Sequence, residues 1–223
     1  MIQKPFTKLA LGCVLGLTVC LTSGIAAEKE NITQMNDQQK QEFRQEYVEN
    51  FKRIGLNTAP GDASMLRILI EASNARRGIE VGTATGYGAL LMGMAFEFTG
   101  GELITIDIDP KMVKTAQQHI QNMGLQDTVK VIEGDALKVL PTLEGEFDFL
   151  FLDALKEDYF KYFKAVEDNL KPGSVIVADN VIKSKNAMQD FLTFMEESPD
   201  YHMQIIRADE EKGDGMAIIY KVK

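Results

Sequence analysis

Short apolar runs recur along the chain, and segments with helical spacing separate them. These runs are continuous and mostly rich in β-branched residues, which is typical of buried parallel strands. They cover residues 78–81, 103–106, 129–132, 147–152 and 175–178. The helices predicted between them cover residues 87–98, 110–123, 136–140 and 157–170. This alternation predicts an α/β fold, a doubly wound and mostly parallel Rossmann-like sheet with helices on both faces.

Further predicted elements flank this alternating core. The additional helices cover 36–53, 64–73 and 184–197, and two final strands cover 202–207 and 216–222. The final strands bring the sheet to seven, with a tight turn at Asp214-Gly215 between them. A Pro/Gly loop at 57–63 contains Pro60 and precedes the first helix of the domain. One domain is therefore predicted at 59–223, with a helical extension at 28–58.

The N-terminal segment has the pattern of a targeting signal. Lys4 and Lys8 precede an apolar stretch that ends in small residues, which is typical of a secretory signal peptide over 1–27. An uncleaved membrane anchor at 9–27 is the alternative, because about 20 apolar residues can span a bilayer. A lipoprotein signal at Cys20 is a third reading. In each case the domain is expected to be exported, as a periplasmic or secreted protein or a membrane-anchored one.

Charge and cysteine content narrow the function. The chain of 223 residues has a formal net charge of -9, and residues 28–223 carry -11. Such an acidic domain excludes nucleic acid as a partner, because binding polyphosphate needs a cationic surface. The two cysteines, Cys13 and Cys20, both lie in the N-terminal segment. Disulfides, thiolate catalysis and cysteine-ligated zinc are therefore excluded from residues 28–223.

A glycine loop follows the first strand of the alternating core. Its glycines, at 82, 86 and 88, have the spacing G-x-x-x-G-x-G, which differs from the G-x-G-x-x-G of dinucleotide sites. Glycine lets the backbone turn sharply and approach a ligand closely. The loop therefore suits an uncharged or zwitterionic ligand better than a pyrophosphate. A tight strand-to-helix turn without a ligand is the simpler alternative.

Acidic residues end the next two strands. Asp107 ends the second strand, where a carboxylate can accept both hydroxyls of a ribose. Asp109 is expected to cap the helix that begins at Pro110. Gly134-Asp135-Ala136 ends the third strand, where a small residue leaves room for an adenine edge. Asp135 taken alone would be a helix cap.

Oxygen donors and a lysine follow the fourth and fifth strands. Asp153 follows one strand and Asp179-Asn180 the other, and neighbouring strands of a parallel sheet would bring them together. Carboxylate and amide oxygens favour Mg²⁺ or Ca²⁺ over zinc or copper. The alternative is that Asp153 caps a helix and that Asp179-Asn180 form a turn. Lys156 lies one helical turn after Asp153, as a candidate base or as a surface ion-pair partner.

The ordered set of motifs resembles the class I S-adenosylmethionine (SAM)-dependent methyltransferases. The resemblance is closest to the cation-dependent O-methyltransferase family that includes catechol and caffeoyl-CoA O-methyltransferases. It spans about 59–220 and rests on Gly61-Asp62-Ala63, the loop at 80–88, Asp107, the segment 151–156, Asp179-Asn180 and Gly213-Asp214-Gly215.

The resemblance implies SAM as co-substrate, a divalent cation such as Mg²⁺, and methylation of a small catechol-like phenol. Its implied metal ligands are Asp153, Asp179 and Asn180, and Lys156 would be the general base. The residues implied in cofactor binding are Pro60, Glu80, Gly82, Thr83, Gly86, Tyr87, Gly88, Asp107, Asp135, Ala136 and Asp153.

Departures from the family pattern leave the acceptor open. Leu155 stands where catechol methyltransferase has tryptophan, and aromatic walls are what grip flat phenols. The substrate-side carboxylate of the family has two candidates, Asp209 and Glu210. An exported non-catalytic binding protein is an alternative, since SAM is made in the cytosol. An NAD-dependent dehydrogenase is disfavoured by the glycine spacing, and a homodimer remains open.

Overall fold

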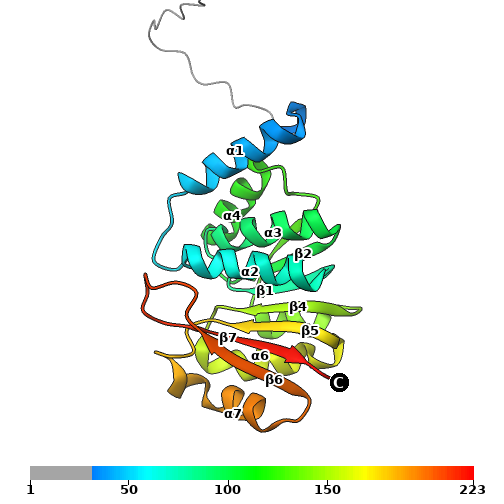
Figure 1. Cartoon of the computed structure of the whole chain (residues 1–223), viewed down its shortest axis with the longest axis vertical. Helices are drawn as coiled ribbons and strands as arrows, with labels where there is room; N and C mark the ends of the chain where they lie inside the picture. Colours follow the sequence, from blue (N-terminus) through cyan, green and yellow to red (C-terminus); the bar gives the residue numbers. More distant parts are fainter. Residues whose placement is uncertain (1–31) are drawn as a thin grey trace, which may run out of the picture. The chain divides into compact units, whose positions relative to one another are not determined.

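A seven-stranded sheet runs through the residues that the computed structural model describes, 32–223 (Figure 1). The predicted signal peptide or anchor at 1–27 lies outside these described residues. Within them, no helix combines the length and the apolar character needed to cross a membrane. Ile32–Lys223 form one compact unit, so the described part of the predicted helical extension, 32–58, belongs to the same unit as the domain that it precedes.

The strand order confirms the predicted doubly wound sheet. The strands are β1 (Arg77–Val81), β2 (Glu102–Asp107), β3 (Val129–Glu133), β4 (Phe147–Leu152), β5 (Leu170–Ala178), β6 (Tyr201–Ile206) and β7 (Met216–Lys221). Their order is β3-β2-β1-β4-β5-β7-β6. The first five pair in parallel, and β7 pairs antiparallel with both β5 and β6. The order reverses between β1 and β4, which is where doubly wound sheets bind ligands.

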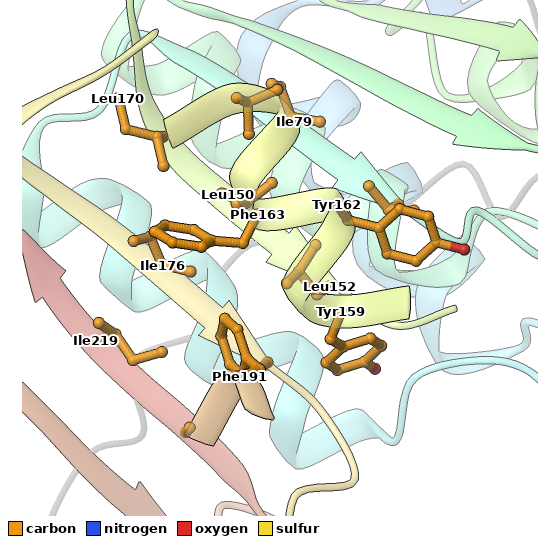
Figure 2. Close-up of a cluster of buried hydrophobic side chains, with 14 of the residues drawn as sticks. Ile79, Leu150, Leu152, Tyr159, Tyr162, Phe163, Leu170, Ile176, Phe191 and Ile219 are labelled. Carbon is orange, nitrogen blue, oxygen red and sulfur yellow. The ribbon is translucent and has the colours of Figure 1, made fainter. Parts of the chain in front are cut away.

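Helices cover both faces of the sheet. They are α1 (Asp37–Glu49), α2 (Pro60–Ser73), α3 (Tyr87–Thr99), α4 (Pro110–Asn122), α5 (Ala136–Val139), α6 (Tyr159–Val166) and α7 (Gln189–Glu197). Along β4, Phe149 and Phe151 pack with α2, α3 and α4, while Leu150 and Leu152 pack with α5, α6 and α7. Figure 2 shows the second cluster, with Phe163 beside these leucines. Both faces are apolar, as the continuous strand pattern requires.

Several element boundaries and one turn differ from the sequence prediction. Helix α2 begins at Pro60, four residues earlier than predicted, because proline suits the first turn of a helix. Strand β5 begins at Leu170, where the predicted helix 157–170 was expected to end. Strands β6 and β7 are joined by residues 207–215, so the predicted tight turn at Asp214-Gly215 is wrong. The Asp214 carboxylate instead accepts the amides of Ile182, Lys183 and Gly215.

Helix α1 is held to the domain by a buried arginine. Its N-terminus carries a capping box between Asn36 and Gln39. Arg44 pairs with Glu97 of α3 at 2.5 Å and donates to the carbonyl of Met123 at 3.0 Å. These bonds reach α3 and the end of α4, so α1 is fixed against both helices.

Candidate active site

Backbone hydrogen bonds continue past the strand ends and hold the following residues at one edge of the sheet. The amide of Gly82 donates to Ile106, that of Asp153 to Val81, and that of Asp179 to Leu152, all within 3.0 Å. Four strands, β1, β2, β4 and β5, are therefore linked beyond their last residues. The predicted site residues that follow them start from a common, rigid edge.

A cavity of about 770 Å³ opens at this edge. Predicted site residues from five separate segments line it: Gly82, Asp107, Asp135, Ala136, Asp153, Lys156 and Asn180. Its volume lies within the usual range for small-molecule sites. The remaining predicted residues do not line it: Pro60, Glu80, Thr83, Gly86, Tyr87, Gly88 and Asp179.

Left-handed backbone shapes the glycine loop. Gly82 has φ +104°, and a Cβ there would lie 2.2 Å from the carbonyl oxygen of Asp153. Only glycine allows the loop to approach the end of β4 so closely. Ala84 also has positive φ, at 46°, and its amide donates to the Asp107 carboxylate at 2.8 Å. The loop is thus tied to β4 by close packing and to β2 by a hydrogen bond.

The acids after β2 and β3 each hold the local backbone. Asp107 accepts the amides of Ala84 and Asp109, and its carboxylate lines the cavity. Asp109 caps α4 through the amide of Lys111, as predicted. Asp135 caps α5 through Leu137 and also lines the cavity, so the two readings of this residue are compatible.

Buried polar side chains of β1 and β2 form hydrogen bonds next to the glycine loop. The Thr105 hydroxyl donates to Glu80 at 2.5 Å and also bonds the Thr83 hydroxyl. Burial raises the pKa of Glu80 to about 8, although the Thr105 hydrogen bond opposes this shift. A Cβ at Gly88 would lie 3.0 Å from Oε1 of Glu80, so the glycine makes room for this carboxyl group. Tyr87 is also buried, 5.2 Å from the Phe51 ring.

Two carboxyl groups are buried where β4 and β5 end. Lys156 Nζ lies 2.9 Å from Asp153 Oδ1 and lines the cavity with it. Burial raises the pKa of Asp153, against the opposing effect of Lys156. Asp179 is 1% exposed, and burial followed by the negative charge of Asp153 raises its pKa to about 7. Its Oδ1 accepts the Asn180 amide, while its Oδ2 is buried with no hydrogen-bond partner.

The donor set suits a hard cation. An orphaned buried carboxylate oxygen is costly unless a ligand or ion satisfies it. Asp153, Asp179 and Asn180 are the residues that could hold such an ion, since all three offer oxygen. Asn180 has φ 61°, a strained conformation of the kind that clusters at functional sites. Among residues 32–223, no group of three or more His, Cys, Asp or Glu side chains is placed to hold a metal, and this set has only two carboxylates.

Two segments missed by the sequence analysis complete the cavity. Gly55 and Leu56 come from the stretch before α2, and Lys212 comes from the β6–β7 connection. Lys212 Nζ donates to the carbonyl of Asn57 at 2.5 Å, which joins the two segments. No sequence motif marks these residues, because loops from distant parts of the chain meet only in the folded protein.

A further buried acid lies close to this edge. Asp62, in the first turn of α2, is 6% exposed. Burial raises its pKa to about 6, with Asp209 adding to the shift and Lys212 opposing it. Sequence analysis placed Asp62 within a family motif and assigned it no role.

Comparison with known proteins identifies the family. The family model for O-methyltransferases matches residues 29–208. A catechol O-methyltransferase from Niastella koreensis is 34% identical over 139 residues, which cover 60% of this chain and 62% of that protein. The match thus spans less than two thirds of that relative's length. A catechol O-methyltransferase from Mycobacterium tuberculosis is 32% identical over 179 residues, which cover 74% of this chain and 80% of that protein.

The fold points to the same family. The structure of the O-methyltransferase TomG from Streptomyces achromogenes, in complex with SAM, matches with a TM-score of 0.72. It is 26% identical, and the match covers 85% of this chain and 92% of that one. With a family model that spans most of the sequence, the chain belongs to the O-methyltransferase family, within the class I SAM-dependent methyltransferases.

Proposed function

We propose that this protein transfers the methyl group of SAM to a hydroxyl of a small vicinal diol of the catechol type, with a divalent cation bound at the site. The observation that carries the proposal is the convergence on one cavity of Gly82, Asp107, Asp153, Lys156 and Asn180. Methyl transfer to a diol requires a site for the methyl donor, a base for the hydroxyl proton and oxygen ligands for the cation. The glycine loop, Lys156, and Asp153 with Asn180 would supply these three. Family membership supports the same reaction class.

The cavity divides into parts with different chemistry. The loop around Gly82 would hold the methionine portion of SAM, and Asp107 would accept the ribose hydroxyls. Ile108 follows Asp107, is 71% exposed and lines the cavity, so it offers an apolar surface to an adenine ring. Burying such side chains under a ligand is favourable, at about 25 cal/mol per Å² of apolar surface.

Lys156 would act as the general base. Its Nζ lies 2.9 Å from Asp153 and lines the cavity. Only the neutral amine can accept the proton of the acceptor hydroxyl, and the positive charges of the cation and of the SAM sulfonium would favour that form. A cation held by Asp153, Asp179 and Asn180 would supply Lewis acidity that lowers the pKa of the acceptor hydroxyl. The protein would then contribute mainly alignment, since the oxyanion must attack in line with the departing sulfur.

Substitution at Asp179 tests this assignment. Asp179→Ala is expected to reduce metal-dependent methyl transfer to a catechol by at least about a hundredfold, because a ligand is lost. The affinity for S-adenosylhomocysteine should change little, since Asp179 does not line the cavity. The readouts are a methyl-transfer assay across a Mg²⁺ titration and calorimetric binding of S-adenosylhomocysteine.

Asp127→Ala, at an exposed acid in the connection between α4 and β3, is the matched control. Unchanged activity in Asp179→Ala would refute the metal assignment. No binding of S-adenosylhomocysteine by the wild type would refute the wider proposal.

We also propose that residues 1–27 direct the domain to export or anchor it to a membrane. The basic start, apolar middle and small-residue end of this segment support the proposal. Fractionation of cells that express the full chain is the test, and recovery of the intact chain in the cytosol alone would contradict it.

A further inference from the structure

A second cavity of about 510 Å³ adjoins the first. Its lining is Gly55, Asn180, Lys183, Glu211, Lys212 and Asp214. It shares Gly55, Asn180 and Lys212 with the first cavity, and it includes none of the residues of the glycine loop. If SAM binds at the glycine loop, the second cavity is not covered by it. The second cavity, which reaches the first at Asn180, is then available to the acceptor.

The two acids of the second cavity are already satisfied within the protein. Glu211 makes a bidentate pair with Arg53, with bonds of 3.1 and 2.7 Å. Asp214 is buried and accepts three backbone amides. Arg53 therefore compensates the charge of Glu211, and the three amides satisfy Oδ1 of Asp214.

The two lysines are not satisfied in this way. Within the described residues, neither Lys183 nor Lys212 lies within 4.0 Å of a carboxylate. The Lys183 ammonium donates to the carbonyl of Lys212, and the Lys212 ammonium to the carbonyl of Asn57. An ammonium has three donors, so each lysine keeps two for other partners. Two cationic groups with free donors thus line a cavity beside the proposed reaction centre.

We propose that Lys183 and Lys212 form a subsite for a carboxylate on the acceptor, so that the preferred substrate is a vicinal diol on an aromatic acid. This specificity rests on the proposed function. The diol would lie at Asp153 and Asn180, and the ring would carry its carboxylate into the second cavity. Charge-assisted hydrogen bonds from lysine to carboxylate are about twice as strong as neutral ones. An acceptor with an ammonium group in place of the carboxylate would be repelled by the positive charges of Lys183 and Lys212.

The test compares three acceptors that differ in one group. They are a dihydroxybenzoate with adjacent hydroxyls, its methyl ester, and the corresponding benzylamine. The full chain, with Mg²⁺ and SAM, should show a kcat/KM for the acid about tenfold or more above that for the ester. The amine should be the poorest substrate of the three. Raising the salt concentration should narrow these differences.

Variants at Lys183 decide which residue is responsible. Lys183→Gln should lower the ratio of kcat/KM for acid to ester about tenfold, and Lys183→Arg should retain most of it. Lys185→Gln is the matched control, since Lys185 is exposed and lines neither cavity. Lys212 is a less clean target because its bond to Asn57 joins two loops.

The outcomes separate this inference from the proposed function. Methylation of the ester with an acid-to-ester ratio near one, or a ratio unchanged in Lys183→Gln, would overturn the subsite while leaving the function intact. If no acceptor is methylated, calorimetry with the full chain, Mg²⁺ and S-adenosylhomocysteine decides the subsite. Tighter binding of the acid than of the ester, lost in Lys183→Gln, would support it, and equal binding would overturn it.

Discussion

Among the described residues, two of the three non-glycine residues with positive φ, Ala84 and Asn180, line the cavity. Gly82, Ala84 and Asn180 all line it with positive φ, at 104°, 46° and 61°. A non-glycine residue in this region costs of the order of 1–3 kcal/mol and persists only where neighbouring contacts fix it. Here the Asp107 carboxylate fixes Ala84, and Asp179 fixes Asn180.

Gly82 is the position where this geometry is least tolerant. Gly82→Ala is expected to lower the free energy of unfolding by at least about 2 kcal/mol, because a Cβ would meet the Asp153 carbonyl at a disfavoured φ. Binding of S-adenosylhomocysteine should weaken as well, since the clash displaces the loop. Urea unfolding and calorimetry measure the two effects.

Gly55→Ala is the control for this substitution. Nothing lies within 4 Å of a Cβ at Gly55, so its free energy of unfolding should stay within about 0.5 kcal/mol of the wild type. Equal effects of the two substitutions would contradict the account of the loop.

The positions of the cavity-lining residues were predictable where those residues end or follow a strand. Asp107, Asp153 and Asn180 could be located because each follows an apolar run, and parallel strands end at one edge. Lys183 and Lys212 could not be singled out, since lysines in loops are common. The role proposed for them depends on the pairing of Arg53 with Glu211, which only the fold reveals.

At the scale of elements, Arg44 is the buried charged contact that couples α1 to the domain, beside the apolar packing of Phe43, Tyr47 and Val48. The Arg44 side chain is 7% exposed and bonds Glu97 and two carbonyls after α4. Removing one partner of such a buried network leaves the others unsatisfied, which costs more than the bond itself contributes.

Arg44→Met is therefore expected to lower the free energy of unfolding by about 2–4 kcal/mol. The methionine keeps most of the apolar volume, so the loss reports on charge and hydrogen bonding. Urea unfolding is the measurement, with Arg67→Met as control, because Arg67 forms an exposed pair with Glu71 on α2. A similar cost for both substitutions would show that α1 is not held by Arg44.

The boundaries of elements were harder to predict than their order. The pattern gave all seven strands, because continuous apolar runs are distinctive. It placed the start of α2 too late, although Pro60 is a regular signal for the first helical turn. It also missed the start of β5, where Pro172 and Gly173 interrupt the apolar run before the buried part of the strand.

Across the whole molecule, several buried acids connect stability to pH. Burial raises the pKa of Asp62 to about 6 and that of Asp179 to about 7, from ordinary values of 3.8. Each therefore keeps its proton in the folded state after the unfolded chain has lost it. The stability that each contributes is complete below about pH 4 and is lost as the pH rises through the folded pKa.

Asp62→Asn should consequently gain stability relative to the ligand-free wild type as the pH rises from about 4 to about 6, by roughly 1–2 kcal/mol. Asp179→Asn should likewise gain stability relative to the ligand-free wild type as the pH rises to about 7. Mg²⁺ should remove this gain, because it stabilises the wild-type protein with an ionised Asp179. Urea unfolding at several pH values, with Mg²⁺ or with EDTA, measures both. A stability difference that is independent of pH would contradict the burial of these groups.

The division of labour between the sheet and its loops has an evolutionary consequence. Main-chain hydrogen bonds to neighbouring strands hold the backbone at Gly82, Asp153 and Asp179, where β1, β4 and β5 end. The second cavity, by contrast, is lined by three connections between elements, at 50–59, 179–184 and 207–215. Duplicated descendants of this gene could thus exchange one acceptor for another by altering these connections, Asn180 apart, and inherit the proposed methylation chemistry unchanged.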